Sequence, residues 1–528
     1  MPHWFQPVFT TLFAPRFARF ARRLANPAAA QRVLLRRILR QVARTEYGRG
    51  HRITGREDYI AFRDQLPIVA YEDLRDWIER QSRSRAPVIA PEPVRVYEKT
   101  SGSTGRQKLI PYTPSLLRSF DRMAFLWAYD LLRHGPQFTT GRLFFSVSAP
   151  FQDERSTASG VPVSLDDDSE YLSPLMRRLF GSCFVHPRGL KGLRDPVQYR
   201  RVLAATLVAE ARLEVLFIWN PTYLTALFEL VEAERSRLMA DLRAGAIAVQ
   251  GRVFPLASLD ADRRRALERT PIDWSGLWPE LKLISCWTDA GTAPFARRLG
   301  RLFPGVLMQG KGLLATEAPL TVPLLRASAP VPLVDEVFFE FEGGDGEICL
   351  LHELEDDAEY EVIVTQQGGL CRYRINDRVS VSGRYADTPC LRFVGRARDV
   401  SDLVGEKLHE AFVRAALQRA FPGDDGFAFL VPVRTESGTP YYLCLADRAP
   451  AGVEACAQRL DAELMEAFHY RQARLLGQLG SVQLVVRADA QARYDDHCAA
   501  QGMKWGDIKY AALLRSADAR AVTRFLAA

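Results

Sequence analysis

The sequence predicts an α/β fold divided between a large N-terminal domain and a smaller C-terminal domain. With 528 residues, 47% of them hydrophobic, the chain is too long for one ordinary core. Strand-like and helical stretches alternate from residue 30 to residue 340, as in helices packed around a largely parallel sheet. From Glu336 to Phe393 the pattern is strand-rich, and after Gly395 it mixes helices and strands. We therefore expect domains at residues 1–395 and 396–528.

Two amphipathic helices are expected at the start of the chain. The first has apolar residues at helical spacing with arginines between them: Phe13, Phe17, Phe20 and Leu24. We expect it to dock on its own domain, and the alternative is a helix lying on a membrane surface. The second helix, with Leu35 and Ile38 on its apolar face, is expected to end near Gly48.

Short apolar runs predict the strands that follow. Those of the parallel sheet are expected at residues 142–147, 215–219, 281–286 and 306–308, with helices such as 223–233 and 294–303 between them. Turn residues separate the strands expected in the β-subdomain, at residues 336–342, 346–351, 361–365 and 391–394.

Composition excludes several classes of function. The net charge of +7 comes from 70 basic and 63 acidic residues, which is a mixed surface rather than the one-sign field of a nucleic-acid-binding protein. The eight cysteines form no CxxC pair and no cluster with zinc spacing, as expected for a reducing cytosol. The first residues lack the apolar run of a signal peptide, and no stretch of about 18 apolar residues occurs. We expect a cytoplasmic protein without membrane insertion.

The segment from Thr100 to Lys108 is typical of a loop that holds phosphate. It combines the hydroxyls of Thr100, Ser101, Ser103 and Thr104 with Gly102 and Gly105, follows a strand-like run at residues 94–97, and ends in a lysine. Glycines allow backbone N–H groups to turn toward an anion, hydroxyls add donors, and Lys108 adds a positive charge. The alternative is an ordinary Ser/Gly turn.

Other nucleotide and hydrolase motifs do not fit. Lys108 follows Gln107 and precedes Leu109, so the loop is not a Walker A motif. The run from Gly310 to Ala315 matches G-x-G-x-x-A, but Pro319 and Pro323 follow too soon for the helix that a dinucleotide site requires. No G-x-S-x-G elbow or H-E-x-x-H helix occurs.

Taken with this loop, the chain resembles the Gretchen Hagen family of acyl-acid amido synthetases, within the adenylate-forming superfamily of acyl ligases. Further motifs occur in the family's order, and together they span most of the chain: Leu66 to Leu74, Ile110 to Tyr112, Leu314 to Glu317, Tyr373 to Asp377, Phe393 to Arg396 and Gly506 to Lys509. Two positions depart from the family pattern. Asn376 replaces a glycine, and Leu313 replaces an aromatic residue that packs on adenine.

The resemblance implies ATP and Mg²⁺ as cofactors and assigns roles to particular residues. Glu317 would be the magnesium ligand, and Thr316 would donate to the α-phosphate. Asp377 would accept hydrogen bonds from both ribose hydroxyls, because one carboxylate offers two acceptor oxygens. Arg396 would belong to the ATP site at the hinge before a mobile C-terminal domain. Lys509 would contact the α-phosphate and the carboxylate during adenylation, with Lys504 as its rival.

The acyl pocket is expected where aromatic residues end the predicted strands: Trp219, Tyr223 and Trp287. Core packing is the alternative for each of them.

The predicted function is activation of a carboxylic acid as acyl-AMP, followed by transfer of the acyl group to an amine or amino acid. Thioester formation with coenzyme A or a carrier protein is one alternative, and a non-catalytic nucleotide-binding module is another. The motifs at residues 66–74 and 110–112 are specific to the amide-forming branch and favour the amide. The sequence identifies neither the acid nor the amine, nor the oligomeric state.

Overall fold

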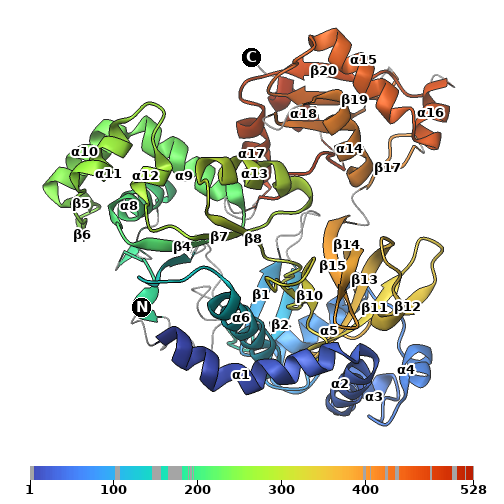
Figure 1. Cartoon of the computed structure of the whole chain (residues 1–528). Coiled ribbons are helices and arrows are strands. Elements are labelled where there is room, and N and C mark those ends of the chain that lie inside the picture. Colours follow the sequence, from blue (N-terminus) through green and yellow to red (C-terminus); the bar gives the residue numbers. More distant parts are fainter. Residues whose placement is uncertain are drawn as a thin grey trace. The chain divides into compact units, whose positions relative to one another are not determined.

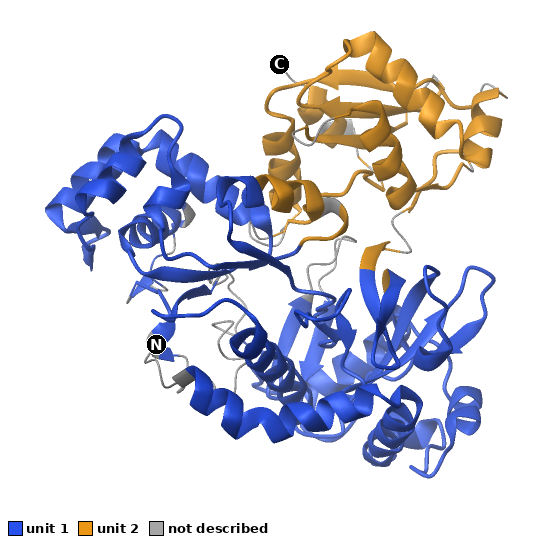
Figure 2. Cartoon of the chain, in the orientation of Figure 1, with its two compact units in different colours: residues 1–287, 299–375, 379–392 blue, residues 288–298, 376–378, 393–528 orange. Residues whose placement is uncertain are grey.

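A computed structural model of the chain shows two compact units (Figures 1 and 2). It describes residues 5–100, 108–145, 156–163, 181–187, 189–190, 193, 195–396, 400–404, 406–422, 426–434, 439–475, 478–501, 503, 508–515, 517 and 519–526. The first unit comprises residues 1–287, 299–375 and 379–392, and the second comprises residues 288–298, 376–378 and 393–528. The boundary expected at residue 396 stays a prediction.

The N-terminal helix α1 (Phe5–Leu24) docks on its own unit. Its Phe17 ring stacks on Tyr129 of helix α6 (Pro114–His134) at 4.6 Å, and its Phe13 ring lies 5.2 Å from Phe125. Figure 1 shows the two helices side by side. These contacts confirm the docked helix.

The second helix is shorter than expected. Helix α2 (Pro27–Val42) begins where the Asn26 side chain accepts the Ala29 N–H, and it ends at Val42 rather than near Gly48. The Thr45 side chain accepts the Gly48 N–H and so begins a separate short helix, α3 (Glu46–Gly50). The chain continues through α4 (Tyr59–Gln65) and α5 (Tyr71–Arg83).

The central sheet is parallel, as predicted, with strand order β3-β4-β7-β8. Its strands are β3 (Arg142–Phe145), β4 (Leu213–Phe217), β7 (Leu283–Cys286) and β8 (Leu307–Gly310). Helices α8 (Pro196–Ala209), α9 (Pro221–Ala233) and α13 (Ala293–Leu302) lie between these strands in the chain. The segment between α9 and β7 also contains α10 (Arg235–Ala244), the hairpin strands β5 (Ala246–Val249) and β6 (Arg252–Pro255), α11 (Ala261–Glu268) and α12 (Trp274–Leu277).

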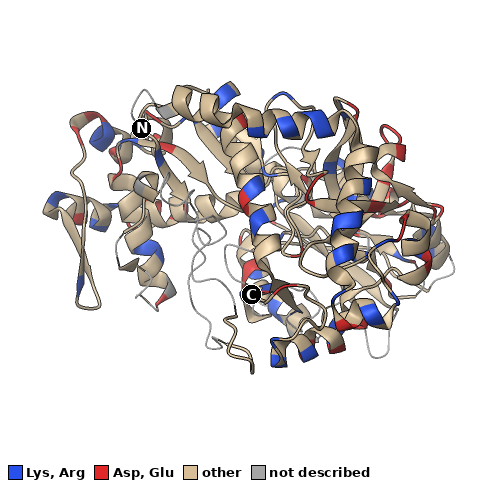
Figure 3. Ribbon diagram, turned by 90° about the horizontal axis from the view of Figure 1, so that it is seen from below, with Lys and Arg blue, Asp and Glu red and all other residues tan. Residues whose placement is uncertain are grey.

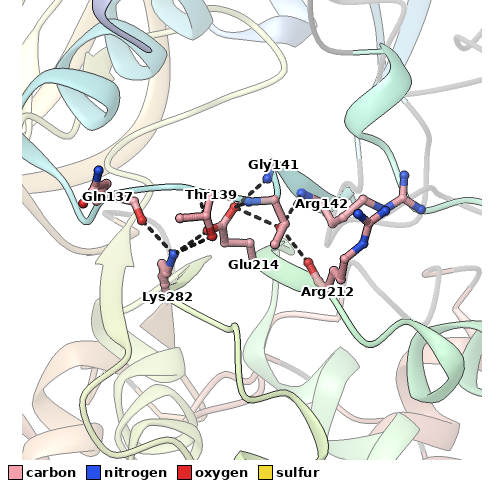
Figure 4. Close-up of polar contacts among 8 residues, drawn as sticks. Gln137, Thr139, Gly141, Arg142, Arg212, Glu214 and Lys282 are labelled. Carbon is pink, nitrogen blue, oxygen red and sulfur yellow. Dashed lines mark hydrogen bonds and ion pairs between the residues drawn. The ribbon is translucent and has the colours of Figure 1, made fainter. Parts of the chain in front are cut away.

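A buried ion pair ties the sheet to the preceding loop (Figure 4). The Glu214 carboxylate of β4 is fully buried and lies 2.6 Å from the Lys282 ammonium. It also accepts the backbone N–H groups of Thr139, Thr140 and Gly141, at 2.6, 2.9 and 2.6 Å. These contacts fix the start of β3 beside the starts of β4 and β7.

The strand-rich region is a five-stranded sheet with order β12-β11-β13-β14-β15. Its strands are β11 (Val337–Glu342), β12 (Ile348–Leu350), β13 (Glu359–Gln366), β14 (Tyr373–Tyr385) and β15 (Thr388–Arg396). Strand β14, the longest of them, was not predicted, because polar residues such as Asn376 and Asp377 interrupt its apolar pattern. The short strands β9 (Thr321–Val322) and β10 (Val331–Pro332) pair with each other, and both precede this sheet in the sequence.

The second unit contains a sheet with order β18-β19-β20 and helices on both faces. Its strands are β18 (Ala428–Val433), β19 (Tyr441–Ala446) and β20 (Gln483–Val486). One core includes residues of α14 (Glu410–Ala420), α15 (Val453–Leu464) and α16 (Phe468–Leu475). The other includes residues of α17 (Ala490–Ala500) and α18 (Ala519–Leu526). The small strands β16 (Val400–Ser401) and β17 (Leu408–His409) precede α14.

Among the described residues, no helix is long and apolar enough to cross a membrane. Basic and acidic residues are interspersed along the ribbon (Figure 3), as the mixed composition predicts.

Candidate active site

The predicted phosphate loop closes a β-hairpin. Strand β1 (Val96–Thr100) pairs with β2 (Lys108–Tyr112), and Thr100 is the register partner of Lys108. Thr100 therefore ends a strand, which extends three residues beyond the predicted one. The predicted loop residues Ser101, Gly102, Ser103, Thr104 and Gly105 lie outside the described residues.

Tyr71 anchors the far end of this loop. Its hydroxyl accepts the Leu109 N–H at 2.9 Å, and the Lys108 ammonium lies 5.4 Å from the centre of its ring. A cation over an aromatic face is held by the ring quadrupole. Tyr71 belongs to the 66–74 motif, so that motif contacts the residue that follows the loop.

Thr316 and Glu317 lie at the tip of a tight turn. Leu314 and Pro319 form an isolated antiparallel bridge, and Ala315 and Ala318 exchange backbone hydrogen bonds at 3.2 Å. No helix follows β8 here, which confirms that the G-x-G-x-x-A match does not open a helix. Both turn residues are half-buried.

Two tyrosines connect this turn to other motifs. Tyr112, the last residue of β2, donates its hydroxyl to the Thr316 carbonyl at 2.6 Å. Tyr373, the first residue of β14, donates to the Glu317 Oε1 at 3.5 Å. Burial of Tyr373, together with the nearby charge of Glu317, raises the pKa of its hydroxyl far above the ordinary value, so it stays a donor at neutral pH.

The 66–74 motif also holds Tyr373 in place. Val69 forms a parallel bridge with Tyr373 and exchanges backbone hydrogen bonds with Arg372 and Arg374. The buried Arg372 guanidinium pairs with Glu340 at 2.8 Å and also donates to the Leu66 carbonyl. Lys108, Tyr71, Tyr373 and Glu317 are thus linked through one motif, although they come from four separate parts of the chain.

Asp377 and Arg396 lie on the neighbouring strands β14 and β15 and face each other. The Arg396 Nε is 3.6 Å from the Asp377 Oδ1, and the two side chains are 28% and 18% exposed. Asn376 has a φ of +62°, in the left-handed region that its family counterpart, glycine, adopts freely. The asparagine thus meets the backbone requirement at this position.

Lys509 follows the buried Ile508 and precedes the buried Tyr510, and it is itself exposed. The Tyr494 hydroxyl donates to the Lys509 carbonyl at 3.1 Å, which fixes the backbone from which the side chain projects. Lys504 lies outside the described residues.

Two of the three predicted acyl-pocket residues lie together. The rings of Trp219 and Trp287 are 6.0 Å apart, at the ends of β4 and β7, and both are half-buried. Tyr223 lies in the first turn of α9 and is 8% exposed, in the core. Leu313 is buried, with its N–H donated to the Thr321 hydroxyl at 2.8 Å.

Sequence reasoning missed several residues of this region. Tyr71, Tyr112 and Tyr373 lie inside predicted motifs but had no predicted role, although a tyrosine in each of three motifs was a usable signal. Lys311 lies in the run that matches G-x-G-x-x-A and had no predicted role of its own. The structure places Lys311, 5% exposed, beside Phe217 and Trp219.

Comparison with known proteins identifies the family. The model of the GH3 family N-terminal domain matches residues 16–308, and that of the GH3 family central domain matches residues 331–396. The chain is 26% identical to a probable indole-3-acetic acid-amido synthetase, GH3.12, of Oryza sativa subsp. japonica, over 93% of this chain and 92% of the relative. It is 24% identical to the indole-3-acetic acid-amido synthetase GH3.4 of Arabidopsis thaliana, over 75% and 71%.

Solved structures share the fold. The acyl acid amido synthetase AtGH3.15 in complex with 2,4-DB matches with a TM-score of 0.84 at 20% identity, covering 100% of this chain and 97% of that chain. A 2-hydroxyisobutyryl-CoA ligase in the postadenylation state matches with a TM-score of 0.54 at 14% identity, covering 96% and 93%. The family models together cover most of the chain, so it belongs to the GH3 family of acyl acid amido synthetases, ligases related to the ATP-using adenylate-forming enzymes.

Proposed function

We propose that the chain condenses a carboxylic acid with ATP to give an acyl-AMP and pyrophosphate, and then transfers the acyl group to the amino group of an amino acid. The observation that carries this proposal is the linkage of Lys108, Tyr71, Tyr373 and Glu317 at the base of the Ser/Gly-rich loop. Membership of the GH3 family supports the same reaction.

The first half-reaction brings two anions together, because the carboxylate attacks the α-phosphorus of ATP. The site must therefore neutralise phosphate charge and align the attacking oxygen. Loop residues 101–105 would donate N–H and O–H groups to the phosphates, and Lys108 would supply positive charge beside them. Thr316, at the tip of its turn, would donate its hydroxyl to the α-phosphate.

The residues around Glu317 suit a magnesium ion. Mg²⁺ prefers oxygen ligands and binds through one or two carboxylates together with substrate phosphates. Glu317 offers a half-buried carboxylate that the Tyr373 hydroxyl orients. When bound, the ion would offset the charge of the phosphates.

Asp377 and Arg396 would bind the ribose end of the nucleotide. The carboxylate would accept hydrogen bonds from vicinal hydroxyls, while the guanidinium 3.6 Å away would orient it. Lys509 would approach the α-phosphate and the reacting carboxylate during adenylation only, because we propose that the C-terminal domain moves between the two half-reactions.

Acid-dependent exchange of labelled pyrophosphate into ATP tests the adenylation step. We expect exchange with at least one acid of a broad panel and a loss of about 100-fold in Lys108→Ala. Lys99→Ala is the matched control, because Lys99 lies on the other strand of the same hairpin, opposite Leu109. Absence of exchange with every acid would favour a non-catalytic nucleotide-binding module.

Product analysis tests the acceptor. Each acid that supports exchange is incubated with ATP, magnesium and a panel of amino acids and simple amines, and the products are identified by mass spectrometry. We expect an amide together with AMP. Thioester formation with coenzyme A, and no amide across the panel, would overturn the proposed acceptor and leave the adenylation step standing.

A further inference from the structure

Positive charge is concentrated at the start of the chain. The first 56 residues contain twelve arginines, no lysine and a single acidic residue, Glu46, which gives them a net charge of +11. The whole chain carries +7, so the remaining residues carry a net charge of −4. Glu46 itself pairs with Arg80. The balanced composition of the complete sequence therefore conceals a segment with one sign of charge.

The outer face of α1 carries arginines in line with apolar side chains. Exposed side chains recur along it every three or four residues, which is the spacing of one helix face: Val8, Leu12, Arg16, Arg19 and Arg22. The opposite face is the one that packs on α6. Val8 and Leu12 are 51% and 67% exposed, so apolar surface and positive charge reach the solvent on the same face.

Helix α2 continues this basic face. Its exposed arginines recur at four-residue spacing: Arg32, Arg36 and Arg40. Val33, beside them, is 70% exposed. Arg23 of α1 binds the Asp335 carboxylate and Arg37 of α2 donates to the Asp335 carbonyl, so the two helices lie beside each other. Figure 1 shows both along one side of the first unit.

Within the described chain, the exposed charges of this face are not neutralised. Arg19, Arg22 and Arg36 form no ion pair with any residue that the structure describes. The acidic side chain that lies between the helices, Asp335, is buried and already pairs with Arg23. Like charges aligned on a helix repel one another and do not stabilise the fold. Their alignment on one face therefore points to an anionic partner.

The apolar side chains on this face indicate the kind of anion. A lipid bilayer presents charged headgroups with an apolar layer just below them, which matches arginines and apolar residues on one face of a helix that lies in the membrane plane. Nucleic acid supplies phosphate charge but offers no apolar layer to Val8, Leu12 and Val33. The chemistry of the face thus favours a membrane surface.

We propose that the outer face of α1 and α2 binds the surface of an anionic phospholipid bilayer, with the arginines at the headgroups and Val8 and Leu12 in the shallow apolar layer. Helix α1 stays docked on its own unit, because its opposite face makes those contacts. Binding is peripheral and is weakened by salt, because exposed charges carry most of it. It is independent of the proposed reaction.

Co-sedimentation of the full chain with vesicles tests the proposal. Vesicles of phosphatidylcholine alone are compared with vesicles that also contain the anionic lipid phosphatidylglycerol, at low salt and at about 0.5 M NaCl. We expect binding to the anionic vesicles only, and only at low salt. The variant Arg19→Gln/Arg22→Gln/Arg36→Gln should bind them about a hundredfold more weakly, since each arginine near an anionic surface contributes roughly fivefold.

The variant Arg237→Gln/Arg243→Gln/Arg264→Gln is the matched control. It removes the same charge from exposed positions of α10 and α11, in the same unit, and should bind like the wild type. Both triple variants should keep the wild-type circular dichroism spectrum and melting temperature, because the replaced side chains are exposed. Equal binding of the two triple variants to anionic vesicles overturns the proposal, as does a wild type that binds no anionic vesicle.

A second variant separates a membrane from other polyanions. Val8→Ser/Leu12→Ser removes exposed apolar surface and leaves every charge in place. We expect it to bind anionic vesicles about tenfold more weakly than the wild type does, and to leave any binding to a DNA duplex unchanged. Unchanged vesicle binding in this variant, together with tighter wild-type binding to the duplex, would assign the face to nucleic acid and overturn the proposal.

Discussion

Replacing Glu214 by glutamine should destabilise the first unit strongly. The change keeps the side-chain volume but removes the charge that faces Lys282. It also converts one acceptor oxygen into an NH₂ group that points at the backbone donors of residues 139–141. Loss of one partner of a buried pair costs about 3–5 kcal/mol. Because the Lys282 side chain is 25% exposed, water can solvate it in the variant, and we expect about 3 kcal/mol.

Urea denaturation followed by circular dichroism at pH 7 measures this loss as a shift of the unfolding midpoint. Glu210→Gln is the matched control, because Glu210 also pairs with a basic side chain, Arg142, but is not fully buried. The Glu210 and Arg142 side chains are 17% and 25% exposed. Its loss should be below about 1 kcal/mol. A Glu214→Gln variant within about 1 kcal/mol of the wild type would refute the reasoning from the buried network.

The same network predicts a direction for the pH dependence of stability. Burial works to raise the pKa of Glu214, but the hydrogen bond and charge of Lys282, together with the backbone donors, outweigh it and lower the pKa below the ordinary 4.5. A lowered folded-state pKa contributes stability that is complete above the unfolded value and is lost as pH falls through the folded value. The wild type should therefore lose stability below about pH 4.5 more steeply than Glu214→Gln, as thermal melts would show.

Three further predictions concern the proposed site. Glu317→Ala should reduce pyrophosphate exchange by about 100-fold or more, because about 3 kcal/mol of charge stabilisation is lost. The melting temperature should not change. Near-normal exchange at saturating magnesium would exclude Glu317 from the proposed site. Lys509→Ala should lose exchange yet convert supplied acyl-AMP to amide, and the same pattern in Lys504→Ala would reassign the role. Asp377→Asn should raise the KM for ATP and abolish discrimination against 2′-deoxy-ATP, and unchanged discrimination would remove Asp377 from the ribose site.

The sequence by itself determined most of the local structure. The apolar runs at 215–219 and 281–286 became β4 and β7 within two residues, because a strand buried on both faces carries a continuous apolar pattern. The prolines after Ala315 excluded a helix there, and the structure has a turn. The family followed from motifs whose order is a property of the sequence alone.

Only the tertiary structure decided which side chains meet. Tyr71 and Tyr373 are about 300 residues apart in the chain, and their proximity to Lys108 and Glu317 depends on the bridge between Val69 and Tyr373. Likewise, Lys311 looks like an ordinary polar residue between two glycines until β8 pairs beside β7 and brings it against Phe217. Periodicity reports only the neighbours within a few residues, whereas strand pairing and burial depend on contacts that close long loops. The physical reason for the difference is that a side chain's partner is chosen by the packing of distant elements and not by its own local pattern.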